Sequence, residues 1–156
     1  MLSAALVTGN CAILKPAEQT SLIAKKLFEC FLEAGMPKEA AAFLPGDGEE
    51  IGAFMTDDPR ISTIVFTGSK TVGLEIYKKA VSDFENVEHI RRVIAEMGGK
   101  NAIIIDNDAD LDEAVKGTLY SAFGFQGQKC SACSRAFVVG DAYEVFLERL
   151  SEATKS

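Results

Sequence analysis

The sequence is poor in tryptophan, histidine, proline, basic residues and long apolar runs, and these absences exclude several classes of protein. Its 156 residues include no tryptophan, one histidine and four prolines, and 23 acidic residues outnumber 16 basic ones. The net charge of −7 comes without any basic stripe, which disfavours nucleic-acid binding. No apolar run reaches the length of a membrane span, and the first ten residues lack the basic start and apolar core of a signal peptide.

Cysteine and histidine are too sparse for a disulfide scaffold or a metal centre. Four cysteines without disulfide-type density favour a reducing, cytoplasm-like compartment. Cys130 and Cys133 form a C-x-x-C, but structural zinc normally needs a second pair of ligands. A thioredoxin-type pair would stand at the start of a helix, whereas this one runs into a strand-like stretch. His89, in a charged stretch beside Glu88, is expected at the surface. We expect no metal site.

The hydrophobic residues that are present, 47% of the chain, follow alternating strand-like and helix-like patterns. This alternation predicts an α/β fold with parallel strands, and Gly98-Gly99 is a plausible junction between domains at 1–98 and 99–156. Strands are expected at 11–14, 41–44, 61–66, 90–95, 102–106 and 136–139, the first of them buried. Helices are expected at 2–6, 22–34, 49–55 and 70–81, from about 110, and near the C-terminus.

Polar residues stand at the carboxyl ends of three predicted strands, where ligand sites of parallel sheets gather. Gly68 and Ser69 join a strand to a helix in T-G-S-K, which suits a phosphate, although a common serine N-cap has the same pattern. Lys15 and Glu18 could hydrogen-bond the hydroxyls of a ribose, or be an ordinary solvated pair. The nearby G-D-G-E-E-I-G has the wrong spacing and too many acidic residues for a dinucleotide fingerprint.

Two further residues have side chains suited to catalysis. Glu96 ends an apolar strand, and a carboxylate at a dry strand end can serve as a general base; a turn carboxylate bound by backbone N–H groups is the alternative. Cys130 follows a loop punctuated by Gly124 and Gly127, a setting that can expose a nucleophilic thiolate. The alternative for Cys130 is a small buried hydrophobic residue.

Four stretches together resemble the aldehyde dehydrogenase superfamily. They are G-N-C-A-I-L-K-P-A-E-Q-T at 9–20, F-T-G-S at 66–69, E-M-G-G-K-N at 96–101 and G-Q-K-C at 127–130. Within it, R-R-V-I-A-E-M-G-G-K-N and G-Q-K-C-S-A-C-S-R are similar to the pyrroline-5-carboxylate dehydrogenase subfamily. The resemblance implies an incomplete Rossmann-like parallel sheet that binds NAD, followed by the start of an α/β catalytic domain.

The resemblance also implies roles for the cofactor-binding residues. Lys15 and Glu18 would hold the adenosine ribose of NAD. Ser69 would meet the pyrophosphate, and Gly68 would allow its close approach. Gly98, with the glycine after it, would leave room for the cofactor and for movement of the base.

For catalysis, the resemblance implies an NAD-dependent oxidation of glutamate semialdehyde to glutamate in proline catabolism. Cys130 would attack the aldehyde, and Glu96 would activate the water that hydrolyses the resulting thioester. Ser131 would help to bind the carboxylate of the substrate. The implied parent protein is a cytoplasmic homo-oligomer, in bacteria often fused to proline dehydrogenase.

The chain departs from the family in length, because members run to several hundred residues. The asparagine that stabilises the oxyanion in the family has no counterpart in this chain, and we expect the 156 residues to be an inactive excerpt of an enzyme. Two other interpretations stay open. One is a dehydrogenase for another semialdehyde, and the other is a truncated, non-catalytic module that binds a nucleotide or a partner.

Overall fold

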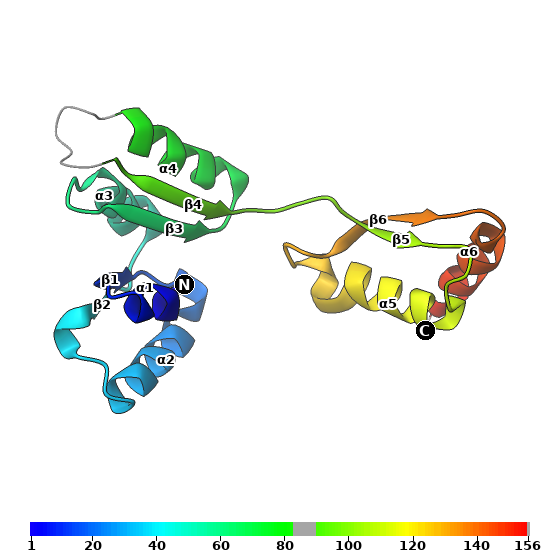
Figure 1. Ribbon diagram of the computed structural model, residues 1–156, viewed down its shortest axis with the longest axis horizontal. Helices are drawn as coiled ribbons and strands as arrows, with labels where there is room; N and C mark the ends of the chain where they lie inside the picture. The colour runs from blue at the N-terminus through cyan, green and yellow to red at the C-terminus, as the bar shows by residue number, and fades with distance from the viewer. Residues whose placement is uncertain (83–89, 156) are drawn as a thin grey trace. The chain divides into compact units, whose positions relative to one another are not determined.

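The computed structural model describes residues 1–82 and 90–155. The chain divides into two compact units (Figure 1). The first unit comprises Met1–Phe66 and Thr71–Ala95, and the second comprises Thr67–Lys70 and Glu96–Ser156. No helix in the described ranges is long and apolar enough to cross a membrane.

The first half of the first unit is a strand–helix–strand arrangement. Strands β1 (Ala12–Leu14) and β2 (Ala41–Phe43) pair in parallel, with Ala12 opposite Ala41. The intervening helix α2 (Ser21–Glu33) contacts this pair through Phe28 and Phe43, whose ring centroids are 5.7 Å apart. The remaining elements are the helix α1 (Leu2–Val7) and the short 3₁₀ helices η1 (Glu18–Thr20) and η2 (Lys38–Ala40).

The second half of the first unit repeats this arrangement. Strands β3 (Thr63–Thr67) and β4 (Arg92–Glu96) are hydrogen-bonded neighbours that run in the same direction, with α4 (Lys70–Ser82) beside them (Figure 1). A π-helical turn, η3 (Gly48–Gly52), and the helix α3 (Ala53–Asp57) precede β3.

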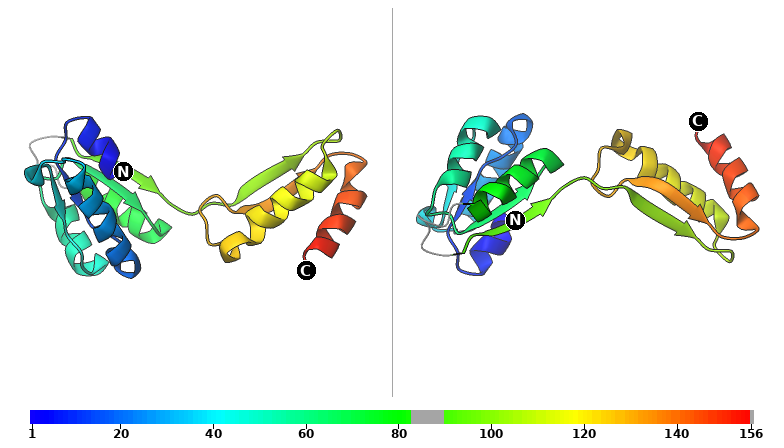
Figure 2. Two further views of the ribbon diagram at one scale, coloured as in Figure 1. Left: turned by 90° about the horizontal axis from the view of Figure 1, so that it is seen from below. Right: turned by 90° about the horizontal axis from the view of Figure 1, so that it is seen from above.

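The second unit is built on the parallel pair of β5 (Asn101–Ile105) and β6 (Cys133–Val138). Helices α5 (Leu111–Phe123) and α6 (Ala142–Ala153) lie on the same side of this pair (Figure 2). The 3₁₀ helix η4 (Gly124–Gly127) follows α5 and leads into the loop before β6. Ile105, Val115 and Phe146 form the core of the unit.

The α/β alternation predicted from the sequence is confirmed, with bounds that differ by a few residues. The β6 strand begins at Cys133 rather than at 136, because it pairs with β5 from Asn101 onward. The first strand is wrong as a buried strand: Ile13 is 50% exposed, since within the described part of the chain β1 is hydrogen-bonded to β2 alone. The division into domains at 1–98 and 99–156 stays a prediction, and His89 lies outside the described residues.

Candidate active site

Glu96 and Cys130 line one open depression of the second unit, about 290 Å³ in volume. Its other walls come from the end of β3, the Met97–Gly99 segment and the loop before Cys130. The full set of lining residues is Thr67, Gly68, Glu96, Met97, Gly98, Gly99, Gly127, Gln128, Lys129 and Cys130. The structure thus brings the predicted nucleophile and the predicted base to one place.

Glu96 is held by the pairing of two strand ends. It is the last residue of β4, and its carbonyl oxygen accepts a hydrogen bond of 3.1 Å from the N–H of Gly68, just beyond β3. The backbone is therefore fixed at the carboxyl edge of the strand pair. The expected dry setting is wrong, because the Glu96 side chain is exposed at the edge of the depression.

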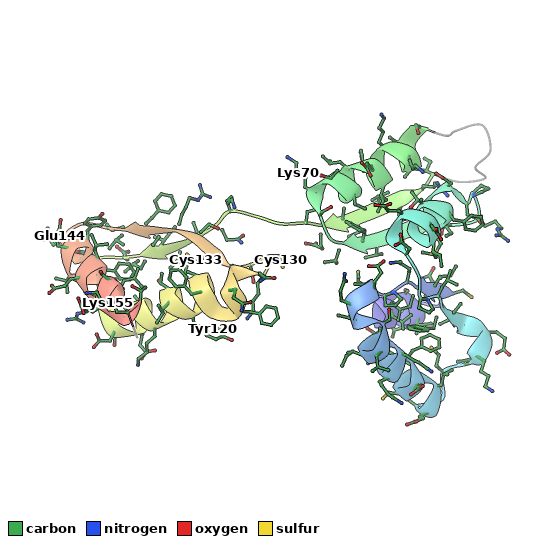
Figure 3. The ribbon with its side chains drawn as sticks, turned by 180° about the vertical axis from the view of Figure 1, so that it is seen from behind. Lys70, Tyr120, Cys130, Cys133, Glu144 and Lys155 are labelled. Carbon is green, nitrogen blue, oxygen red and sulfur yellow. The ribbon has the colours of Figure 1, made fainter. Side chains whose placement is uncertain are left out.

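Cys130 is an exposed free thiol on the loop between α5 and β6, whereas Cys133 lies farther along, where β6 begins (Figure 3). The interpretation of Cys130 as a small buried hydrophobic residue is therefore wrong. An accessible thiol is what nucleophilic attack on a substrate requires.

The loop before Cys130 has an unusual backbone. Phe125 and Gln126 both have φ of 56°, a left-handed conformation that side chains resist. Gly127 follows with φ of 68°, and a Cβ atom there would lie 2.9 Å from the carbonyl oxygen of Ala122. Glycine is therefore needed at 127. Backbone strain of this kind is often found at functional sites.

Asn101, on the neighbouring strand β5, holds the loop that carries Cys130, the predicted nucleophile, and this contact was not foreseen from the sequence. Its Nδ2 donates to the carbonyl oxygen of Cys130 at 2.7 Å and to that of Ala132 at 3.1 Å. Gly99 lies beside this amide: a Cβ atom on Gly99 would be 3.1 Å from Oδ1 of Asn101 and 3.5 Å from the carbonyl oxygen of Cys130. The only signal in the sequence was the membership of Asn101 in the E-M-G-G-K-N stretch.

Cys133 is engaged in the start of β6. Its N–H donates to Oγ of Ser121 at 3.2 Å, and its Sγ donates to the carbonyl oxygen of Arg135 at 3.3 Å. Among the residues that the structure describes, no group of three or more potential ligands could hold a metal ion. The backbone and the thiol of Cys133 thus both have partners at the start of the strand.

Lys129, which directly precedes Cys130, points its ammonium group at the ring of Tyr120. Nζ of Lys129 lies 5.1 Å from the ring centroid of Tyr120, within the range of a cation–π interaction. This contact joins the nucleophile loop to the last turns of α5.

Lys15 and Glu18 form a close ion pair in the first unit. Nζ of Lys15 lies 2.5 Å from Oε1 of Glu18. The hydrogen bond from Lys15, together with the backbone N–H groups of Glu18 and Gly48, holds the pKa of the Glu18 carboxyl below its usual value. Gly48, from the glycine-rich stretch set aside above, adjoins both groups, since a Cβ atom on it would lie 3.5 Å from Oε1 of Glu18 and 3.8 Å from Nζ of Lys15.

This pair suits the hydroxyl groups of a ribose. An ammonium group has three N–H donors and the carboxylate has several lone pairs, so both can bind a ligand while remaining paired. The donors and acceptors of the pair are therefore compatible with the ribose of a nucleotide.

The remaining predicted residues are placed at accessible positions. Ser69 is exposed directly before α4, and Ser131 is exposed directly after Cys130. Gly98 lines the depression, and a Cβ atom on it would meet no described atom within 4 Å. Neither Ser69 nor Ser131 is among the residues that line the depression.

A larger depression, about 640 Å³, lies between α5 and α6. Its walls include the ion pair between Arg149 and Asp112, at 2.7 Å, and the nearby Lys116 and Glu152. None of the predicted site residues is among those that line it.

Comparisons with known proteins identify the family of the chain. The family model described as "Aldehyde dehydrogenase family" matches residues 1–156. The 1-pyrroline-5-carboxylate dehydrogenase of Geobacillus kaustophilus is 49% identical over 152 residues, which are 97% of this chain and 30% of that protein. The chain therefore spans less than a third of this curated relative.

Two solved structures are similar over nearly the whole chain. Proline utilization A from Bdellovibrio bacteriovorus has a TM-score of 0.91 and 52% identity, covering 100% of this chain and 16% of that one. A 1-pyrroline-5-carboxylate dehydrogenase from Thermus with bound NAD has a TM-score of 0.86 and 48% identity, covering 94% of this chain and 28% of that one. The chain belongs to the aldehyde dehydrogenase family.

Proposed function

We propose that this chain supplies the nucleophile and the general base of an NAD-dependent dehydrogenase that oxidises glutamate semialdehyde to glutamate. The observation that carries the proposal is the presence of Cys130 and Glu96 at one depression. The substrate is inferred from relatives named 1-pyrroline-5-carboxylate dehydrogenase, since pyrroline-5-carboxylate is the cyclised form of this semialdehyde.

Cys130 acts first. Its thiolate attacks the aldehyde carbon, a carbon–sulfur bond forms, and the carbonyl oxygen takes up the charge and then a proton. Loss of the hydroxyl proton, together with loss of the carbon-bound hydrogen with its electron pair, turns this thiohemiacetal into a thioester. The thioester keeps the acyl group activated for the second half of the reaction.

Glu96 acts second. Its carboxylate accepts a proton from water, which attacks the thioester carbon, and the carbon–sulfur bond breaks to regenerate the thiolate. The exposure of Glu96 at the depression gives it access to water. The sum is the conversion of aldehyde and water to a carboxylic acid with release of two electrons and two protons.

Bound NAD would supply the acceptor for those two electrons. Lys15 and Glu18 would hold its adenosine ribose, Ser69 and Gly68 would bind its pyrophosphate at the start of α4, and Gly98 would leave it space. The support is the paired ammonium and carboxylate of the first unit and the exposure of Ser69.

Further expectations concern substrate binding and context. Ser131, exposed beside the nucleophile, would donate a hydrogen bond to the substrate carboxylate. The free cysteines support a reducing compartment, which we take to be the cytoplasm. Similarity to proline utilization A supports fusion to a proline dehydrogenase in a longer polypeptide, and a homo-oligomeric parent protein stays a prediction.

The function is tested by a segment swap. Residues 1–156 replace the matching segment of the Geobacillus kaustophilus enzyme, and NADH formation from pyrroline-5-carboxylate is followed beside other semialdehydes and beside the chain alone, which we expect to be inactive. Cys130→Ala should abolish turnover. Glu96→Gln should leave a single burst of NADH, and mass spectrometry should find an acyl group on Cys130.

One control variant makes the result interpretable. Cys133→Ala in the same chimera tests whether the loss of any thiol is sufficient, and we expect this variant to keep most of its activity. Turnover by the Cys130→Ala chimera, or a Glu96→Gln chimera that turns over normally, would contradict the proposal. Turnover with a different semialdehyde and none with pyrroline-5-carboxylate would reject the substrate alone.

A further inference from the structure

We propose that Asn101 is the positioning residue for the nucleophile: its side-chain amide fixes the backbone on which Cys130 is carried. This inference rests on the proposed function, because it assigns Asn101 a part in that reaction. The residue does not itself touch the reacting atoms. It acts through the loop that ends at β6.

The amide of Asn101 holds two peptide groups at once. Nδ2 donates to the carbonyl oxygens of Cys130 and Ala132, at 2.7 and 3.1 Å. A peptide is planar and trans, so fixing a carbonyl also fixes the direction of the following N–H. The N–H of Cys133 is accordingly found on Oγ of Ser121. The Cys130–Ser131 and Ala132–Cys133 peptides therefore have set orientations, and the first of them is attached directly to the Cα atom that carries the thiol of Cys130.

The amide is in turn held in place. Asn101 is the first residue of β5 and pairs with Cys133, and a register shift follows between Asn101 and Ala102. The preceding carbonyl oxygen, that of Lys100, accepts a hydrogen bond of 2.5 Å from Nη2 of Arg135 on β6. Gly99 leaves the space that the amide occupies, since a Cβ atom there would lie 3.1 Å from Oδ1.

Asn101 also links the segment that begins with the proposed base, Glu96, to the loop of the proposed nucleophile, Cys130. The short segment 96–101 begins with the proposed base and ends with this amide, which reaches the loop of the nucleophile. The same amide therefore ties the base-bearing segment to the loop that carries the thiol. Misplacement of a reacting group by about 1 Å can cost ~100-fold in rate.

The test compares two substitutions of similar size with a matched control. Asn101→Leu removes the donor without adding charge, and Asn101→Asp replaces it with an oxygen that faces two carbonyl oxygens. Asn107→Leu makes the same chemical change beyond the far end of β5, where the side chain is exposed. Backbone amide hydrogen exchange is measured on the 156-residue chain, and kcat and KM on the chimera described above.

Both Asn101 variants should speed amide exchange at 130–133 while the β5–β6 core, including Ile105, keeps its protection. In the chimera, kcat should fall about 10-fold to 100-fold with the KM for NAD unchanged, and Asn107→Leu should change neither. Unchanged exchange at 130–133, faster exchange throughout the second unit, or kcat within about twofold of the parent chimera would overturn the proposal.

The two proposals fail in different ways. If the parent chimera is inactive, or if the Cys130→Ala chimera is active, the proposed function fails, and the exchange measurement alone decides whether Asn101 fixes the loop. If Cys130→Ala is inactive while both Asn101 variants keep full kcat, the function stands and the positioning role is rejected.

Discussion

Gly127 combines two constraints at the residue scale. Its φ of 68° is costly for any other residue, and the direction in which a Cβ atom would point is already occupied by the carbonyl oxygen of Ala122. Gly9 has the first constraint alone: its φ is 81°, and a Cβ atom there would meet nothing within 4 Å. The two glycines therefore allow the cost of the contact to be separated from the cost of the conformation.

We predict that Gly127→Ala lowers the free energy of unfolding by more than Gly9→Ala does. Both variants should lose about 1–2 kcal/mol through the left-handed backbone, and Gly127→Ala should lose more because the carbonyl contact of 2.9 Å forces the loop to move. Urea unfolding of the two variants measures the difference. Equal losses would show that the loop accommodates the methyl group without cost.

The residues that could be predicted from the sequence are those whose signal is local. Cys130 and Glu96 each end a recognisable stretch, and their side chains are exposed at one depression. Asn101 could not be predicted, because it binds backbone carbonyl oxygens about 30 residues away, and no periodicity records such a bond. The proximity of Gly48 to Lys15 and Glu18 was missed for the same reason.

At the scale of elements, the turn before β3 is organised by one buried arginine. Arg91 donates to the carbonyl oxygens of Thr56, at 2.7 Å, of Ile61, at 3.2 Å, and of Asp58. The Asp58 carboxylate in turn binds the Arg60 guanidinium and its backbone N–H. These bonds from Arg60, with a smaller contribution from Arg91, lower the pKa of Asp58 from 3.8 to about 2.

We predict that Asp58 makes the stability of this turn acid-sensitive. Because the pKa is lower in the folded chain, the stabilising contribution is complete above the unfolded value, near pH 4, and is lost as the pH falls through about 2. The melting temperature of the protein should exceed that of Asp58→Asn above pH 4, and the two should converge toward pH 2. Asp57→Asn, which removes the neighbouring partner of Lys79, should retain the acid-dependent step. A gap between wild type and Asp58→Asn that does not change with pH would contradict this assignment.

Helices and strands could be predicted from the sequence where a periodic pattern of apolar residues extends over the whole element. Helices α2, α4, α5 and α6 have clear helical periodicity, and Asp110 caps α5 by accepting bonds from the N–H groups of Asp112 and Glu113. The first residues of β6 are polar and small, so their strand conformation follows from pairing with β5 rather than from their own preference. The left-handed backbone at Phe125 and Gln126 has no signal in the sequence at all.

At the scale of the whole molecule, large apolar side chains are exposed in both units. On the second unit, Ile104 and Phe137 are partners across the β5–β6 pair, 75% and 52% exposed, on the face away from the core. The apolar strand runs, and some exposure of apolar surface in a short excerpt, were predictable from the sequence. The particular side chains that are exposed were not, because the pattern of one strand does not reveal how many neighbours cover it. A contiguous apolar face of this kind favours self-association.

We predict that the double variant Ile104→Thr with Phe137→Thr reduces self-association of the chain without loss of fold. Light scattering at increasing protein concentration measures the association, and circular dichroism monitors the fold. As a matched control, Ile105→Thr changes a side chain that is only 2% exposed and should destabilise the chain by about 2 kcal/mol or more. Undiminished scattering by the double variant would place the associating surface elsewhere.

The parallel pairing of β5 with β6 is what brings Asn101 to the loop of Cys130. The two strands are joined through the intervening helix α5, and the amide of Asn101 reaches the loop of Cys130 across this pairing. A synthetic peptide copied from 121–135 would therefore be flexible and its Cys130 an ordinary thiol, because Asn101, which holds the loop, lies in a distant part of the chain. The surroundings of the Cys130 thiol therefore belong to the folded unit and not to the segment that carries it.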